Sequence, residues 1–337
     1  MLGNKTNRKN LYFQCWRLIS PWSLTIILIF VFLNVSGAAN YPARSIQIVC
    51  PMPPGGGSDI ASRIIANKLS SLLGQSVVVL NKAGGGGVIG TYAALAATPD
   101  GYTIANVSPT ILAAPLVTKG VTFNVTTDLI PINLSVTGPM LIVVRKDAPW
   151  RTLDELIADA KKNPGKLTYG TTGYGSTLHF AGESFKMYTN TDITHIPMDG
   201  VAPALTALLG GHISMVVPEF GAAHKYLQAG SLRALVTMAK NRHKDIPDVP
   251  TSVEKGLPDL IMSTWQSFAV QLKTPKEIVD KLDEAFKEAL KDKEVIKTFE
   301  TSGWVVENLG SKAAAEFWAK DLQMKKEIAK KINLVPK

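Results

Sequence analysis

Short strand-like runs of apolar residues alternate with longer stretches of helical periodicity along this chain. Residues 46–49 form an apolar run with strand character, and apolar residues recur at helical spacing over 60–73. A second apolar run follows at 76–80. Since one helix separates these two strands, the pattern predicts a βαβ unit in which the strands are parallel.

The same alternation continues to the end of the chain. Further strand-like runs lie at 103–107, 141–144, 167–169, 193–197, 213–217, 232–238 and 265–270. Further helical patterns lie at 178–188, 202–209, 278–289 and 311–331. Strands that alternate with helices predict an α/β protein. A length of 337 residues with 46% apolar and 19% charged residues indicates a folded chain that suits two domains better than one.

A loop rich in proline and glycine joins the first strand to the first helix. It contains Pro54, Gly55, Gly56 and Gly57, and Ser58 or Asp59 is expected to cap the helix. Glycines leave the backbone N–H groups accessible, and a helix N-terminus carries partial positive charge. The loop therefore favours binding of a carboxylate or phosphate. The alternative is a tight turn without a ligand.

A similar loop follows the strand at 167–169, in the second half of the chain. Glycines alternate with hydroxyl residues from 170 to 177, immediately before a helical pattern. Hydroxyl residues also follow the strand at 103–107, where Ser108 and Thr110 occupy the carboxyl end at which ligands of open α/β sheets bind. One glycine loop in each half predicts two α/β domains that face each other across a cleft.

A third glycine-rich loop matches a dinucleotide fingerprint only in form. Gly85, Gly87 and Gly90 satisfy G-x-G-x-x-G between a strand and a helix. The fingerprint is expected after the first strand, with an acidic residue about 20 positions further on. Residues 111–127 contain no acid, so we expect a second glycine loop beside the first and no nucleotide cofactor.

The first 39 residues have the pattern of a signal peptide. The only charges here are basic, an apolar run extends from Leu24 to Val35, and small residues follow from Ser36. Cleavage after Ala38 or after Ala39 fits the pattern, which predicts export to the periplasm. The apolar run is short for a transmembrane span, which needs about 20 residues. Retention of this segment as an N-terminal anchor is the alternative.

Charge and cysteine content exclude several function classes. The net charge of +9 includes four basic residues in the first 39, so the mature chain carries 32 − 27 = +5 and has no basic stripe for nucleic acid. That charge favours an anionic ligand. Cys15 lies in the signal segment and Cys50 ends an apolar strand, so no disulfide or zinc site is expected, and Cys50 is interpreted as a buried apolar residue.

Motifs for catalysis and for metal binding are absent from the sequence. The five histidines lack the spacing of metal ligands, and neither a nucleophile elbow nor a phosphate-binding P-loop appears. We therefore expect a binding protein without cofactor or metal and not an enzyme. The alternative from another class is a nucleotide-dependent or acyl-transfer enzyme that uses the glycine loops.

The order of these motifs resembles the Bug-type substrate-binding proteins, the periplasmic receptors of tripartite tricarboxylate transporters. The resemblance covers essentially the whole mature chain and is carried by the following segments: Tyr41-Pro42, the loop from Pro51 to Asp59, Asn81 with the glycine run, Pro99 to Thr103, Tyr169 to Ser176, His179, Gly200 to Gly211, and Pro247 to Thr251. It implies a type II periplasmic-binding-protein fold, with two α/β domains that close over a small organic acid.

The resemblance also implies which residues hold the ligand. The family grips a carboxylate with the loop after the first strand and with the glycine loop of the second domain, here Pro54 to Asp59 and Thr171, Thr172, Gly173 and Ser176. Ser108 and Thr110 would add hydroxyl groups. The chain departs from the family pattern at Asp199 and Glu219, where an acidic pair would repel a second carboxylate. A monocarboxylate, or an acid with a distal donor or cation, is therefore our hypothesis.

Domain boundaries and partners follow from the same resemblance. Residues 40–140 with 266–337 are expected to form the first domain, and residues 141–265 the second. Partners are expected to be a small organic acid and the membrane subunits of a tripartite tricarboxylate-type transporter, with the receptor acting as a monomer. A receptor that feeds a signalling kinase instead of a transporter is an alternative that the sequence leaves open.

Overall fold

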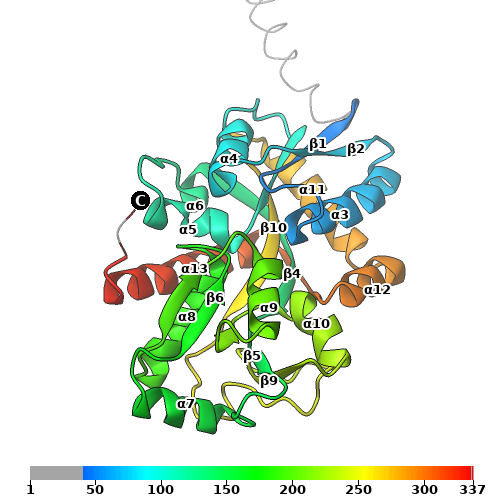
Figure 1. Ribbon diagram of the computed structural model, residues 1–337. Helices are drawn as coiled ribbons and strands as arrows, with labels where there is room; N and C mark the ends of the chain where they lie inside the picture. The colour runs from blue at the N-terminus through cyan, green and yellow to red at the C-terminus, as the bar shows by residue number, and fades with distance from the viewer. Residues whose placement is uncertain (1–40, 335, 337) are drawn as a thin grey trace, which may run out of the picture. The chain divides into compact units, whose positions relative to one another are not determined.

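The structure, a computed structural model, describes residues 41–334 and 336 (Figure 1). The predicted signal peptide lies outside the described residues. The strands and helices named below belong to one compact unit, residues 44–337. They form two mixed β-sheets with helices packed against them.

The first sheet has six strands in the order β11-β4-β10-β3-β1-β2. Their bounds are β1 Ile46–Cys50, β2 Val77–Asn81, β3 Thr103–Val107, β4 Leu129–Pro139, β10 Ser263–Gln271 and β11 Val305–Gly310. β1 is parallel to both β2 and β3, whereas β10 is antiparallel to β3 and β4. The predicted βαβ unit is confirmed, with α3, Gly57–Leu73, between the two strands.

The second sheet has five strands in the order β7-β6-β8-β5-β9. Their bounds are β5 Leu141–Arg145, β6 Thr168–Thr171, β7 Thr194–Pro197, β8 Met215–Val216 and β9 Leu232–Thr237. β6 is parallel to β7 and β8, and β5 is antiparallel to β8 and β9.

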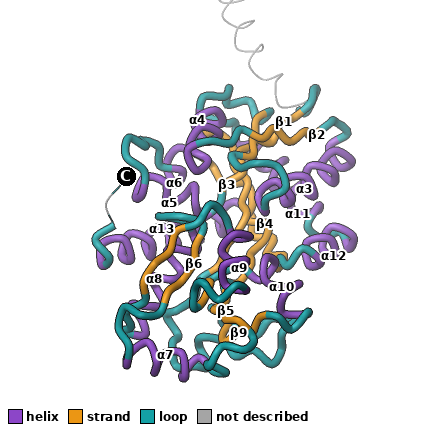
Figure 2. Tube along the Cα trace, in the orientation of Figure 1, coloured by secondary structure: helices purple, strands orange, loops and turns teal. Residues whose placement is uncertain are grey.

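Two neighbouring segments carry the chain from one sheet to the other. β4 leads through Met140 into β5, and Met262 precedes β10. The N–H of Met140 donates to the carbonyl of Met262 at 3.1 Å, and the N–H of Met238 donates to the carbonyl of Met140 at 2.8 Å. β4 and β10 pair along their length beyond this point (Figure 1), and Figure 2 shows the strands in orange in the same orientation. The crossing is therefore a narrow hydrogen-bonded ribbon.

The remaining helices cover the sheets. They are α4 Val88–Leu95, α5 Pro109–Val117, α6 Val125–Asp128, α7 Leu153–Lys162, α8 Thr177–Thr189, α9 Val201–Leu209, α10 Phe220–Gln228, α11 Lys276–Ala289, α12 Lys293–Thr301 and α13 Ser311–Lys331, with a short 3-10 turn, η2, at Gly85–Gly87.

The C-terminal helix α13 contributes to the cores of both sheets. Trp318 and Leu322 pack with residues of the six-stranded sheet, whereas Ile328 packs with residues of the five-stranded sheet. Between them Lys325 is fully buried and donates to the carboxylate of Asp321 at 2.6 Å. A buried ammonium is tolerated because this carboxylate compensates its charge. α13 thus ties the two sheets together at a third point.

One sequence prediction at the start of α3 is wrong. The helix begins at Gly57 instead of residue 60, its N-cap is Gly56, and no side chain caps it. Ser58 and Asp59 lie inside the first turn and are buried. Asp59 does not cap the helix because its carboxylate is used by the loop and by Arg63, as described below. The prediction that Cys50 is a buried, free cysteine is confirmed.

Candidate functional site

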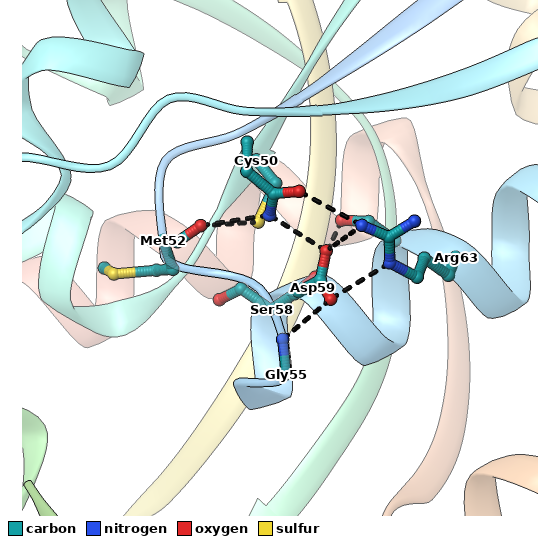
Figure 3. A network of polar contacts seen from close by, with 8 residues as sticks. Cys50, Met52, Gly55, Ser58, Asp59 and Arg63 are labelled. Atoms are coloured by element: carbon teal, nitrogen blue, oxygen red, sulfur yellow. Dashed lines mark hydrogen bonds and ion pairs between the residues drawn. The ribbon is translucent and has the colours of Figure 1, made fainter.

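The loop between β1 and α3 is held by the carboxylate of Asp59 (Figure 3). Its oxygens accept hydrogen bonds from the N–H of Gly55 at 2.9 Å, from Nε of Arg63 at 3.0 Å and from the amide of Asn81 at 2.9 Å. The Asn81 amide also donates to the carbonyl of Met52 at 3.1 Å. One carboxylate thereby fixes both ends of the proline-glycine loop.

This network controls the charge at the start of α3. Hydrogen bonds from Arg63, and from the Gly55 N–H, lower the pKa of Asp59 to about 2 against the cost of burial. The paired guanidinium balances the negative charge of Asp59, which would otherwise oppose an anion at the helix N-terminus. Since no side chain caps the helix, its first N–H groups lack a side-chain acceptor. An external oxygen ligand can take that place.

A cavity of about 270 Å³ opens at this helix end. It is lined by residues of α3 and its loop, of both crossing strands, of α9 and α10, and of the turn before β11: Gly55, Gly56, Gly57, Ile60, Gly138, Val201, Glu219, Gly221, Ala222, Thr264, Ser302, Gly303 and Trp304. The cavity therefore lies between the two sheets. Three of the predicted glycines and the predicted Glu219 meet on it.

Glu219 supplies the acidic side chain of this cavity. It follows β8 and is the N-cap residue of α10, but its side chain accepts no capping hydrogen bond. Burial raises the pKa of its carboxyl group above the ordinary value of 4.5. A carboxyl group with a raised pKa takes up a proton more readily, and in that neutral form it donates a hydrogen bond instead of repelling an anion.

The carboxyl ends of the parallel strands explain why the remaining predicted residues gather nearby. β1 and β3 are parallel neighbours, so the loop that contains Gly57 and the start of α5 lie at one edge of the six-stranded sheet. β6 and β8 are parallel neighbours as well, so Thr171, which ends β6, and Glu219, which follows β8, lie at one edge of the other sheet. The cavity shows that these two edges face each other.

A second contact between the two edges joins α5 to α8. The hydroxyl oxygens of Thr110 and Thr177 lie 3.5 Å apart. A Cβ on Gly175 would lie 2.6 Å from Cβ of Val117, so only glycine permits this approach. Ser108 precedes α5, and its buried hydroxyl has no hydrogen-bond partner among the described residues. An unpartnered buried hydroxyl is costly and is well suited to a bound polar group.

The second predicted glycine loop is shaped by its own side chains. The hydroxyl of Ser176 accepts the N–H of His179 at 3.2 Å and so caps α8. The N–H of Gly175 donates to Nδ1 of His179 at 3.1 Å. Thr171 is buried, and its hydroxyl lies 2.7 Å from Nε2 of His195. Thr172 and Gly173 are half-buried at the turn itself.

The structure thus places the predicted residues in two groups. Gly55, Gly56, Gly57 and Glu219 line the cavity, whereas Ser108, Thr110 and the loop 171–176 lie around the junction of α5 with α8. Asp59 and Ser58 are buried behind the first loop. Pro54 and Asp199 are exposed and do not line this cavity.

The glycine loop at 84–90 serves packing. A Cβ on Gly90 would lie 2.7 Å from Cα of Pro51, and a Cβ on Gly87 would lie 2.4 Å from Cδ1 of Ile111. Glycine therefore lets this loop pack against the end of β1. None of its residues lines the cavity at Gly57.

Three residues that matter for this site were not predicted to belong to it. Asn81 fixes the first loop, and Gly221 and Trp304 line the cavity. Asn81 is the last residue of β2, which is parallel to β1, and this position at the end of the second strand was the available signal for it. Trp304 and Gly221 come from elements far apart in the sequence, so no local pattern marks them.

Within residues 41–334 and 336, no helix has both the length and the apolar character that a membrane span requires. The same part of the chain brings no group of three or more His, Cys, Asp or Glu side chains together as metal ligands.

Comparison with known proteins identifies the family. The sequence profile of TctC, the tripartite tricarboxylate transporter family receptor, matches residues 61–334. The chain belongs to this family of solute-binding transport receptors, which are not enzymes. Protein BugT of Bordetella pertussis is 34% identical over 287 residues, which cover 82% of this chain and 88% of that protein.

Solved structures of periplasmic binding proteins share the fold. BugD matches with a TM-score of 0.75 at 29% identity, covering 88% of this chain and 100% of that chain. Rpa4515 of R. palustris, solved with adipate, matches with a TM-score of 0.79 at 28% identity over 88% and 100%. MatC of Rhodopseudomonas palustris, solved with malate, matches with 0.74 at 27% over 86% and 99%. The predicted type II periplasmic-binding-protein fold is confirmed.

Proposed function

We propose that this chain is a periplasmic receptor that binds a small organic carboxylate at the start of α3 and delivers it to the membrane subunits of a tripartite tricarboxylate-type transporter. The observation that carries the proposal is the uncapped helix end, which opens into a cavity between the two sheets. Small-molecule sites usually measure about 300–1,000 Å³. A cavity of about 270 Å³ therefore suits a small acid.

The site residues take distinct parts in this proposal. The N–H groups of Gly57 and its neighbours donate hydrogen bonds to one carboxylate of the ligand, and Asp59 holds their loop in place. Ser108, Thr110 and the loop 171–176 supply further hydroxyl and amide groups as the edges of the two sheets close. No metal or cofactor is required for such binding.

Ligand choice depends on Glu219 in this proposal. An ionised Glu219 repels a second carboxylate, so a monocarboxylate or an acid with a distal donor or cation fits best. The relatives solved with adipate and malate hold dicarboxylates, which makes the distinction testable. Asp199 is exposed and contributes less than Glu219.

Export and domain movement complete the proposal. Residues 1–39 act as a signal peptide that is cleaved after Ala38 or Ala39, and the mature receptor acts as a monomer in the periplasm without binding nucleic acid. Residues 40–140 with 266–337 and residues 141–265 move as two domains about the crossing at Met140 and Met262. The intact mass of protein recovered from the periplasm tests the cleavage site.

A thermal-shift screen of the protein purified from the periplasm tests binding. The panel holds C3–C8 mono- and dicarboxylates, aromatic acids, amino acids and nucleotides. A ligand at 100 times its dissociation constant stabilises the folded state by about 2.7 kcal/mol, which is several degrees. We expect shifts with one class of carboxylate. Shifts with nucleotides alone would contradict the proposal.

A further inference from the structure

A second cavity adjoins the first, and the two share one lining residue. The second cavity measures about 580 Å³ and is lined by the ends of both crossing strands, the segment 238–244 and residues of α12, β11 and α13. Trp304 lines both cavities. No other residue lines both of them.

The indole of Trp304 is pressed between α3 and the crossing strand β4. A Cβ on Gly57 would lie 3.0 Å from Cζ2 of Trp304, and a Cβ on Gly138 would lie 3.5 Å from Cε3 and from Cζ3. The side chain is therefore in contact with the N-terminus of α3, where we propose that the carboxylate binds. Trp304 is 8% exposed, and its backbone N–H donates to the backbone carbonyl of Phe299 at 3.0 Å.

We propose that Trp304 is a specificity-determining residue that limits the length of the bound acid by closing the first cavity against the second. This inference rests on the proposed function, because it takes the carboxylate to lie at the start of α3. With the indole in place, the acid has the smaller space of about 270 Å³. Without it, the alkyl chain of a longer acid can continue into the space of about 580 Å³.

The second cavity has the chemistry to receive such a chain. Met238, Ile261 and Phe317 give it apolar walls. Lys240 and Lys244 lie on the basic segment that borders it. Lys244 pairs with Glu300 at 2.6 Å, whereas Lys240 has no acidic partner among the described residues. The distal carboxylate of a long dicarboxylate would therefore meet an available ammonium group, and burial of each methylene on the way is favourable.

Calorimetric titration of wild type and Trp304→Ala with two series of acids tests the inference. One series runs from propionate to decanoate, and the other from succinate to sebacate. We expect wild type to bind the short acids. Its affinity should fall by about tenfold or more with each lengthening of the acid beyond what the first cavity holds. Trp304→Ala should bind the longest acids at least about tenfold more tightly than wild type does, with the larger gain for sebacate.

Matched variants separate this effect from general damage. Phe317→Ala removes an aromatic wall of the second cavity alone and should leave the length preference of wild type unchanged. Trp304→Leu serves as a smaller change in case the alanine variant does not fold, and it should shift the preference in the same direction. Circular dichroism confirms that each variant is folded before titration.

The outcomes distinguish this inference from the proposed function. If wild type binds short acids and the folded Trp304 variants keep its length preference, the inference is wrong while the proposed function stands. If wild type already binds decanoate or sebacate as tightly as the short acids, Trp304 does not limit the length of the bound acid and the inference is wrong. If wild type binds none of the acids, the proposed function fails and the inference fails with it.

Discussion

Gly221 and Gly303 lie in direct backbone contact across the cavity. A Cβ on Gly303 would sit 2.5 Å from Cα of Gly221, and a Cβ on Gly221 would sit 2.6 Å from the carbonyl oxygen of Ser302. Gly221 lies in the first turn of α10, beside the five-stranded sheet, and Gly303 lies between α12 and β11, beside the six-stranded sheet. Both residues line the cavity of the proposed ligand site. The two sides approach this closely because neither residue has a side chain.

Gly221→Ala should therefore hold the two sides apart. Contacts under 3.0 Å with a backbone oxygen cannot be relieved by a side-chain movement, so we expect α10 to shift outward. Affinity for the carboxylate should fall by about tenfold, which is about 1.4 kcal/mol. Calorimetric titration measures the loss, and the melting temperature of the free protein should change little.

Gly303→Ala should have the same effect on binding through the opposite side of the contact. Gly303 has φ +81°, so this variant also carries backbone strain. Gly256→Ala is the matched control, because Gly256 has φ +76° but no atom within 4 Å of the added Cβ. Equal losses of affinity in Gly303→Ala and Gly256→Ala would show that the contact with Gly221 has no part in binding.

Asp59→Asn should destabilise the fold in a pH-dependent way. The pKa of Asp59 is lowered to about 2 by Arg63, so its contribution is fully present above the ordinary value of 3.8 and is lost as the pH falls towards 2. Since Arg63 is half exposed, we expect a loss of about 1–2 kcal/mol at pH 7. Urea unfolding at pH 7 and at pH 2 measures both values.

An exposed ion pair provides the control for this prediction. Asp100 pairs with Arg44 at 2.9 Å on the surface, so Asp100→Asn should cost well under about 1 kcal/mol. If Asp59→Asn were as stable as wild type at pH 7, the network around the first loop would not hold it in place.

Glu219 should make carboxylate binding depend on pH. Burial raises its pKa, so at high pH it is ionised and repels the ligand, and as the pH falls through the raised pKa it becomes neutral. Affinity for a monocarboxylate should therefore rise several-fold from pH 8 downwards, at pH values where the ligand itself stays ionised. Glu219→Gln should bind several-fold more tightly at pH 8 and lose this dependence.

The pH dependence of protein stability provides an independent test of the raised pKa of Glu219. Glu219 is half-buried, and desolvation raises the pKa of its carboxyl group, so ionisation of this group costs folding free energy. Glu219→Gln should therefore stabilise the free protein at pH 8 and lose that gain below pH 4.5. Asp199→Asn is the control, because Asp199 is exposed and outside the cavity, and it should alter neither property. If Asp199→Asn removed the pH dependence of binding and Glu219→Gln did not, Glu219 would not be the residue that repels the ligand.

The sequence was sufficient to predict the elements that are local in the chain. The strand, glycine loop and helix from residue 46 to 73 follow from apolar periodicity and from glycine chemistry, and their parallel pairing follows from the single connecting helix. The resemblance to the family predicted the fold, and both the profile match and the solved structures confirm it.

Long-range contacts were beyond what the sequence could predict. Asp59 looked like a helix cap, but Arg63 and Asn81 offer its carboxylate more hydrogen bonds than the helix end does. Trp304 comes to the cavity from a segment more than 240 residues after Gly57, and no spacing rule connects them. Likewise, the position of α13 against both cores depends on packing that only the folded chain reveals.

Gly56→Val tests whether a carboxylate binds at the start of α3. Gly56 is exposed, has φ −81°, and an added Cβ would meet only the carbonyl of Pro53 at 3.7 Å, so the fold should tolerate the change. The valine side chain would lie beside the N–H groups that receive the ligand. Ala83→Val, at an exposed position before the other glycine loop, is the control.

The measurement is calorimetric titration of wild type and both variants with the carboxylate that gives the largest thermal shift. We predict a loss of at least about tenfold in affinity for Gly56→Val and none for Ala83→Val, with both variants folded. Full affinity in Gly56→Val would contradict carboxylate binding at the start of α3, because it would show that the first loop and the α3 N-terminus are not part of the binding site.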